Sequence, residues 1–261
     1  MTLIDTHCHL TYEPLRTRLD EVIADAAAAG VRRMITIGTS PDDAVEARAI
    51  AHRYPAVYFS VGVHPLHSHE VTNDQLPRVA EFAADPRCVA FGEMGLDYHY
   101  DKPPRPRQHE VFQAQLEIIR YSEIAKPVII HCRKAVDDTL AMLLAGGPAM
   151  NRVVFHCFTE LPGEARKVLD AGAWISFTGI VTYKNAQEVR DSAMLVPLDR
   201  IMVETDSPFL TPEPHRKVRT NEPQYVAATA KFLAELRGVS ENEMARITTE
   251  NARRFFGLDG S

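Results

Sequence analysis

The chain has 261 residues, of which 45% are apolar and 25% charged, and its formal net charge is −6 at pH 7. This length suits one (β/α)8 barrel, which takes about 250 residues, or two small domains. The negative charge argues against a protein that coats nucleic acid through its overall charge. No apolar stretch reaches the roughly 18 residues of a membrane span, and no secretory signal pattern opens the chain, so we expect a cytoplasmic protein without membrane contacts.

Eight short apolar runs recur along the chain. Each is nearly continuous in apolar residues, which is typical of strands that are buried on both faces of a parallel sheet. They cover residues 2–6, 33–38, 56–62, 88–93, 127–132, 152–157, 173–178 and 200–205.

The segments between these runs mostly have helical spacing. A helix over 19–30 would end at Gly30, and the next would begin with Ser40 as N-cap and Pro41 at its first position. Further helical patterns occupy 107–125, 161–172, 221–238 and 240–257. The alternation predicts a (β/α)8 TIM barrel forming a single domain over 1–261. The rival is an open doubly wound sheet, but the GxGxxG of its dinucleotide-binding form is absent.

Histidines and acids follow these runs at corresponding positions. His7 and His9 follow the first run, His64 follows the third and Asp206 follows the eighth. The fourth, fifth and sixth runs contain Glu93, His131 and His156 at their ends. In a barrel, all of these lie at the C-terminal ends of the strands, where active sites form. Imidazole and carboxylate groups bind Zn²⁺, Mn²⁺ and related ions. A lone histidine at a strand end is more often structural, but the recurrence of such groups at one end predicts a metal site.

Three cysteines adjoin these histidines. Cys8, Cys132 and Cys157 each lie next to a proposed ligand. Because neighbouring side chains on a strand point to opposite sides, we expect these thiols to face the strand–helix layer as core residues.

Several longer stretches together resemble the TatD-type metal-dependent hydrolases, close to the YcfH-like branch and within the wider amidohydrolase-like barrels. The stretches are IDTHCHL, VGVHP, FGEMGLDYH, VIIHCRKA, VVFHCFTE, ISFTGIV, VPLDRIMVETDSPFL and PHRKVRTNEP. The resemblance implies a two-metal centre in which one ion is held by His7, His9 and Asp206, the second by His131 and His156, and Glu93 bridges them. It also implies that His64 is a nearby catalytic or substrate-orienting residue. Mg²⁺, Mn²⁺ and Zn²⁺ all suit such ligands.

The resemblance further implies hydrolysis of DNA, as a 3′–5′ exonuclease on single strands, with Asp206 as the general base that we infer for the attacking water. Basic residues in two loops, Arg105 after the fourth run and Arg216 and Lys217 after the eighth, are expected to bind the phosphate backbone. No protein partner is predicted. Two alternatives stay open: a hydrolase of another ester, such as aminoacyl-tRNA or a small phosphoester, and a metal-stabilised interaction module without activity.

Overall fold

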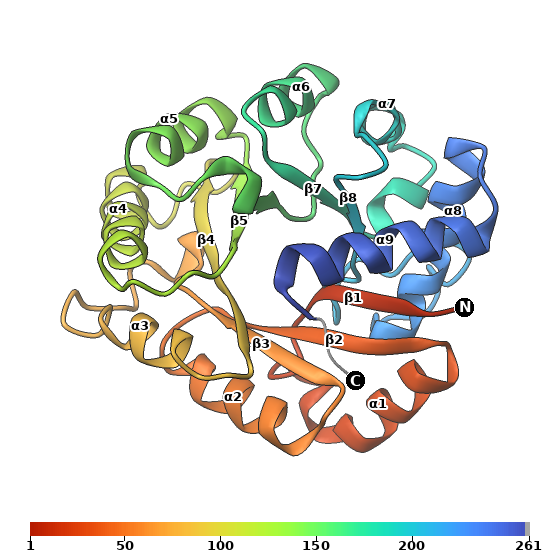
Figure 1. The fold of residues 1–261 in the computed structure, drawn as a ribbon, viewed down its shortest axis with the longest axis horizontal. Helices are drawn as coiled ribbons and strands as arrows, with labels where there is room; N and C mark the ends of the chain where they lie inside the picture. Colours follow the sequence, from red (N-terminus) through yellow and green to blue (C-terminus); the bar gives the residue numbers. More distant parts are fainter. Residues whose placement is uncertain (259–261) are drawn as a thin grey trace.

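The protein folds as a barrel of parallel strands surrounded by helices (Figure 1). The computed structural model describes residues 1–258, so the last three residues of the predicted 1–261 domain lie outside the described residues. The strands are β1 (Leu3–Cys8), β2 (Val31–Gly38), β3 (Val57–Val61), β4 (Cys88–Asp97), β5 (Val128–Arg133), β6 (Val153–Phe155), β7 (Trp174–Phe177) and β8 (Ile201–Val203). Each overlaps one predicted apolar run and pairs with the next in chain order, which confirms the (β/α)8 barrel.

Helices follow each strand on the outside of the barrel. They are α1 (Leu19–Ala28), α2 (Asp43–Arg53), α3 (Arg78–Ala83), α4 (Arg105–Tyr121), α5 (Val136–Gly146), α6 (Pro162–Asp170), α7 (Gln187–Leu195), α8 (Val226–Arg237) and α9 (Glu241–Phe256). The second helix begins at Asp43 rather than at Pro41, although the Ser40 hydroxyl accepts a hydrogen bond from the Asp43 amide at 3.1 Å. None of the helices within residues 1–258 has both the length and the apolar character that a membrane crossing requires.

The barrel closes between β8 and β1 through residues that follow the regular strand of β8. The Asp206 amide donates to the His7 carbonyl oxygen at 2.8 Å, and the His9 amide donates to the Ser207 carbonyl oxygen at 2.7 Å. Because the closure uses these residues, it brings the end of β8 directly against the two histidines of β1.

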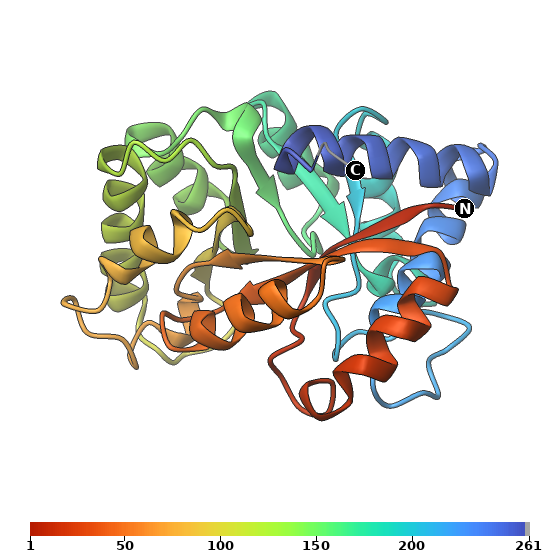
Figure 2. The same ribbon diagram turned by 60° about the horizontal axis from the view of Figure 1, so that its bottom comes forward.

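The N-terminal end of the barrel is filled by apolar side chains. Phe255, Phe256 and Leu258, from the end of α9 and just beyond it, pack with the inward-facing residues Ile4 and Ile129. Figure 2 shows α9 on one side of the barrel and the loop that follows β8 on the other. Apolar side chains thus fill the inside of the barrel at this end, whereas the polar residues that follow the strands lie at the opposite, C-terminal end.

Candidate metal centre

The C-terminal ends of the strands bring all the predicted metal-site residues and His64 together. A cavity of about 660 Å³ lies there, and it is lined by His9, His64, Glu93, His131, His156 and Asp206. His7 lies beneath this lining with no exposed surface. The residues come from β1, β4 and β5 and from the segments directly after β1, β3, β6 and β8. Strand ends that are distant in sequence therefore build one site.

Glu93 lies at the centre of the imidazoles. Its Oε1 is 2.8 Å from His131 Nδ1 and 2.6 Å from His156 Nε2, and its Oε2 is 3.3 Å from His7 Nε2. The side chain is 2% exposed. Each carboxylate oxygen thus faces a different set of imidazoles, which is the arrangement that a carboxylate shared between two ions requires.

Asp206 completes the side of the site next to β1. Its Oδ1 lies 3.1 Å from His9 Nε2 and 3.6 Å from His7 Nε2. The backbone of Asp206 has φ = +54°, a left-handed conformation that aspartate tolerates better than most residues. This sharp turn after β8 directs the carboxylate into the cavity instead of along the strand.

The donor atoms fit a divalent metal. Within residues 1–258 three overlapping groups place one ligand atom from each residue within 4.8 Å of the others, namely His7–His156–Asp206, His7–His9–Glu93 and His64–Glu93–His131. Both ring nitrogens of His7 and the Nδ1 atoms of His9 and His156 are buried and have no hydrogen-bond partner in the described part of the chain. Leaving buried polar atoms unpaired costs free energy, which coordination to a metal removes. His64 belongs to one of these groups by distance, but its Nδ1 accepts a hydrogen bond from the Leu66 amide at 3.0 Å, which leaves the neutral ring without a free lone pair for an ion.

The electrostatics of the cluster keep its acids ionised. Burial alone would raise the pKa of Glu93, but electrostatic interaction with the nearby imidazoles, foremost that of His156, holds the pKa well below its usual value. Burial likewise opposes ionisation of Asp206, yet the hydrogen bond from His9 and the nearby imidazoles lower its pKa to about 2. Burial lowers the pKa of His64 to about 3, so this imidazole is neutral. Anionic carboxylates and neutral imidazole are the forms that bind cations.

Two further acids hold the ring nitrogens that point away from Glu93. Asp97 Oδ2 is 2.9 Å from His131 Nε2, and Glu204 Oε1 is 3.3 Å from His156 Nδ1. The sequence places Glu204 two residues before Asp206, at the end of the eighth apolar run, whereas Asp97 was missed. The signal that could have found Asp97 is its place four residues after Glu93, on the same side of a strand that continues to Asp97.

A glycine permits the close approach of β4 and β5 at this site. Gly95 has φ = +143°, and a Cβ at this position would overlap the carbonyl oxygen of His131. At Gly95, the backbone of β4 therefore lies directly against His131, which the side chains of Glu93 and Asp97 also contact.

The cysteine prediction was correct for two thiols and wrong for one. Cys8 lies in the apolar core, and its Sγ donates to the Ile35 carbonyl oxygen at 3.4 Å. Cys132 also packs in the apolar core, although it borders the cavity as well. Cys157 instead lines the cavity and lies outside the core. For Cys157 the reason is that β6 ends at Phe155 and the chain then turns, with φ = +44° at Cys157, so strand alternation no longer applies. Burial raises the pKa of Cys132 to about 12 and that of Cys157 well above its usual value, so both remain thiols.

The predicted substrate-binding cations lie outside the lining of the cavity. The Arg105 guanidinium packs 4.0 Å from the centre of the Tyr98 ring, and that of Arg216 packs 3.9 Å from the Tyr183 ring. Lys217 is exposed on the loop after β8. Among residues 1–258, the arginine that lines the cavity is Arg133, at the end of β5. Sequence reasoning missed it, although it follows His131 by two residues in VIIHCRK.

Comparison with known proteins agrees with this arrangement. Residues 4–257 match the model of the family described as TatD related DNase. The chain belongs to the TatD family. It is 43% identical to the "Uncharacterized metal-dependent hydrolase YcfH" of Escherichia coli K12, over 100% of this chain and 98% of that protein. It is 34% identical to the "3'-5' ssDNA/RNA exonuclease TatD" of Erwinia tasmaniensis, over 98% of this chain and 100% of that protein.

Solved structures of TatD proteins share the fold. The crystal structure of YJJV, a TatD homologue from Escherichia coli K12, matches with a TM-score of 0.91 and 28% identity, covering 98% of each chain. The TatD-family chain is therefore a metal-dependent hydrolase, and its His, Glu and Asp cluster is the part of the molecule that is suited to binding metal.

Proposed function

We propose that the chain is a two-metal phosphodiesterase that removes nucleotides from the 3′ end of single-stranded DNA. The observation that carries this proposal is Glu93, whose two oxygens face separate groups of imidazoles at the floor of an open cavity. The relative named as a 3′–5′ exonuclease supports the choice of substrate.

The ligands divide between two ions. His7, His9 and Asp206 would hold one, His131 and His156 the other, and Glu93 would bridge them. When bound, Mg²⁺, Mn²⁺ or Zn²⁺ ions supply an activated water and stabilise negative charge on a phosphoryl group.

Asp206 and His64 carry the proton chemistry at the cavity. Asp206 is ionised and 16% exposed, so its carboxylate can accept a proton from the attacking water. His64 Nδ1 accepts a hydrogen bond from the Leu66 amide at 3.0 Å, which leaves the proton of the neutral ring on Nε2. That Nε2–H can donate to a phosphoryl oxygen as negative charge develops there.

The cavity walls suit a nucleotide. Arg133 supplies a cation for a phosphate, while Tyr100 and Phe209, each 50% exposed, present aromatic surface on which bases can stack. Arg105, Arg216 and Lys217 lie farther out and would contact the following phosphates. Because an acidic chain then binds DNA through a few local cations, activity should fall as salt rises.

A 5′-labelled single-stranded oligonucleotide tests the proposal. Protein stripped of metal and supplied separately with Mg²⁺, Mn²⁺ or Zn²⁺ should shorten the strand stepwise from its 3′ end. Asp206→Asn should reduce the rate by about 100- to 10,000-fold, the usual contribution of a general base. Asp170→Asn, a change of the same kind at an exposed position of α6, is the matched control.

The same assay separates the alternatives. If the protein hydrolyses an aminoacyl ester or a small phosphoester but leaves DNA intact with every ion, it is a hydrolase but not a nuclease. Equal rates for Asp206→Asn and the wild type would remove Asp206 from the reaction.

A further inference from the structure

A second cavity lies at the opposite mouth of the barrel. Its volume is about 850 Å³, and it is lined by residues at or just before the N-terminal ends of β3 to β8, together with the end of α9. Val89, Pro127, Trp174 and Phe255 form an apolar floor that is nearly buried. The metal centre, at the C-terminal ends of the same strands, does not use any of these residues.

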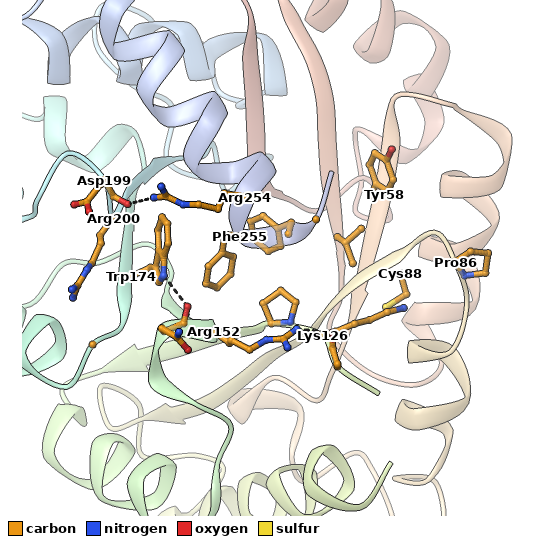
Figure 3. Close-up of a pocket in the computed structure, with 17 residues that line it drawn as sticks. Tyr58, Pro86, Cys88, Lys126, Arg152, Trp174, Asp199, Arg200, Arg254 and Phe255 are labelled. Carbon is orange, nitrogen blue, oxygen red and sulfur yellow. Dashed lines mark hydrogen bonds between the residues drawn. The ribbon is translucent and has the colours of Figure 1, made fainter. Parts of the chain in front are cut away.

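Four cations surround this floor. They are Lys126, Arg152, Arg200 and Arg254, and the carboxylate among the lining residues is that of Asp199. Figure 3 shows Phe255 and Trp174 between Arg254 on one side and Arg152 on the other. In a chain with a net charge of −6, this concentration of positive charge around one cavity is unusual.

These cations contact backbone carbonyl groups rather than acids. Arg152 donates to the Ala125 oxygen at 2.6 Å, and Arg200 to that of Leu169 at 3.1 Å. Within residues 1–258, none of the four makes an ion pair with a carboxylate, whereas cations elsewhere do, for example Arg246 with Glu243 at 2.7 Å. Among the described residues, therefore, no carboxylate is paired directly with any of the four, and Asp199 is the acid that lines the same cavity.

Some of these hydrogen bonds from cations to carbonyl groups have a simpler explanation, which is that they stabilise the barrel itself. Arginines near the C-terminal ends of helices offset the partial negative charge there, as Arg200 does at the end of α6. However, a guanidinium carries five N–H donors, and Arg152 and Arg200 each use one nitrogen in these contacts. Donors therefore remain for a ligand in the cavity.

We propose that this cavity is a second binding site, for a small phosphorylated molecule with an apolar ring, such as a nucleoside monophosphate. The cations would bind the phosphate through charge-assisted hydrogen bonds. The apolar floor would hold the ring, and the volume lies within the usual range of about 300–1,000 Å³ for small-molecule sites. Arg254 and Phe255 already hold the Trp174 ring, at 4.9 Å and 5.2 Å respectively, so the floor is ordered before a ligand binds. The site does not depend on the reaction at the metal centre.

Trp174 provides a direct signal, because it is the single tryptophan of the chain. Metal-loaded protein would be titrated with uridine monophosphate, uridine and inorganic phosphate while tryptophan fluorescence is recorded. We expect saturable binding of the monophosphate and at least tenfold weaker binding of the other two probes. Arg152→Gln combined with Arg254→Gln removes two charges, and it should weaken binding of the monophosphate by about tenfold or more. Arg246→Gln, on the same helix as Arg254, should bind like the wild type.

Several results would overturn the proposal. One is the absence of any saturable signal, and another is uridine that binds as tightly as its monophosphate. A third is unchanged affinity in the double variant, which would place the nucleotide at the metal centre. Equal affinity for inorganic phosphate would reject a nucleotide ligand. If the double variant does not fold, Arg200→Gln alone should still weaken binding, and wild-type affinity in that variant would also contradict the site.

Discussion

At the scale of single residues, we expect Asp97 to determine which nitrogen of His131 binds a metal. The Asp97 carboxylate lies 2.9 Å from His131 Nε2, and His131 Nδ1 lies 2.8 Å from Glu93. With an ion beside Glu93, Nδ1 would give its lone pair to that ion, and Nε2 would keep the proton that it donates to Asp97. Such partners of metal-binding histidines fix the ring and raise its basicity.

Replacement of Asp97 by Asn should therefore weaken metal binding while the barrel stays folded. The expected loss is about 10- to 100-fold in affinity, because the amide is a poorer acceptor and can present its NH₂ group instead. Competition with a chromogenic chelator measures the change, with Asp170→Asn as control. Wild-type affinity in Asp97→Asn would show that Asp97 does not orient the ring.

The sequence predicted well which residues lie together at the C-terminal mouth of the barrel, and it predicted the residues around them less well. His7, Glu93 and His131 could be found because each lies at the end of an apolar run, and parallel strands end at one mouth of a barrel. Asp97 and Arg133 were missed because both strands extend beyond the apolar runs into polar residues. Apolar patterning does not show where such a strand ends.

At the scale of elements, α9 closes the N-terminal end of the barrel. Phe256 is 5% exposed and packs against the strand side chains that point into the barrel. Ser240 caps this helix by accepting a hydrogen bond from the Glu243 amide at 3.1 Å, which agrees with the helix predicted over 240–257.

Removal of the Phe256 ring should open a void beneath the strands. Phe256→Ala is expected to lower the free energy of unfolding by about 3–5 kcal/mol, the usual cost of losing a buried aromatic side chain. Urea denaturation measures the loss, and Arg253→Ala, at an exposed position of the same helix, should change the free energy by less than about 0.5 kcal/mol. Equal midpoints for the two variants would mean that α9 does not support the barrel.

Element boundaries were less predictable than the elements themselves. The helix predicted from Pro41 begins at Asp43, and 3-10 turn Pro223–Tyr225 precedes α8 inside the segment predicted as helix over 221–238. The helices α3, α5 and α7 were not identified separately. The short helices α3 and α7 hold too few apolar positions to set a clear period, and packing against the strands stabilises them instead.

At the scale of the whole molecule, metal binding should be coupled to stability. Both ring nitrogens of His7 and the Nδ1 atom of His9 are buried without a hydrogen-bond partner within the described residues, so ions that bind at these imidazoles should stabilise the folded chain relative to the unfolded one. Free metal at about 1,000 times its dissociation constant should add about 4 kcal/mol.

A chelator should accordingly lower the thermal midpoint, and added Mn²⁺ or Zn²⁺ should restore it. Differential scanning calorimetry measures this change. His52→Ala, which alters a histidine outside the centre that contacts Asp85, should keep the full metal-dependent shift. If chelation leaves the wild-type midpoint unchanged, the imidazole cluster does not bind metal appreciably.

Elemental analysis of the metal content tests the central claim most directly. Wild-type protein that has been reloaded with Zn²⁺ or Mn²⁺ and freed of excess ion should hold two ions per chain, as a bridged centre requires. Glu93→Ala removes the carboxylate that both groups of imidazoles face, so this variant should retain fewer than two. Equal metal content in the two proteins, or none in the wild type, would contradict a centre bridged by Glu93.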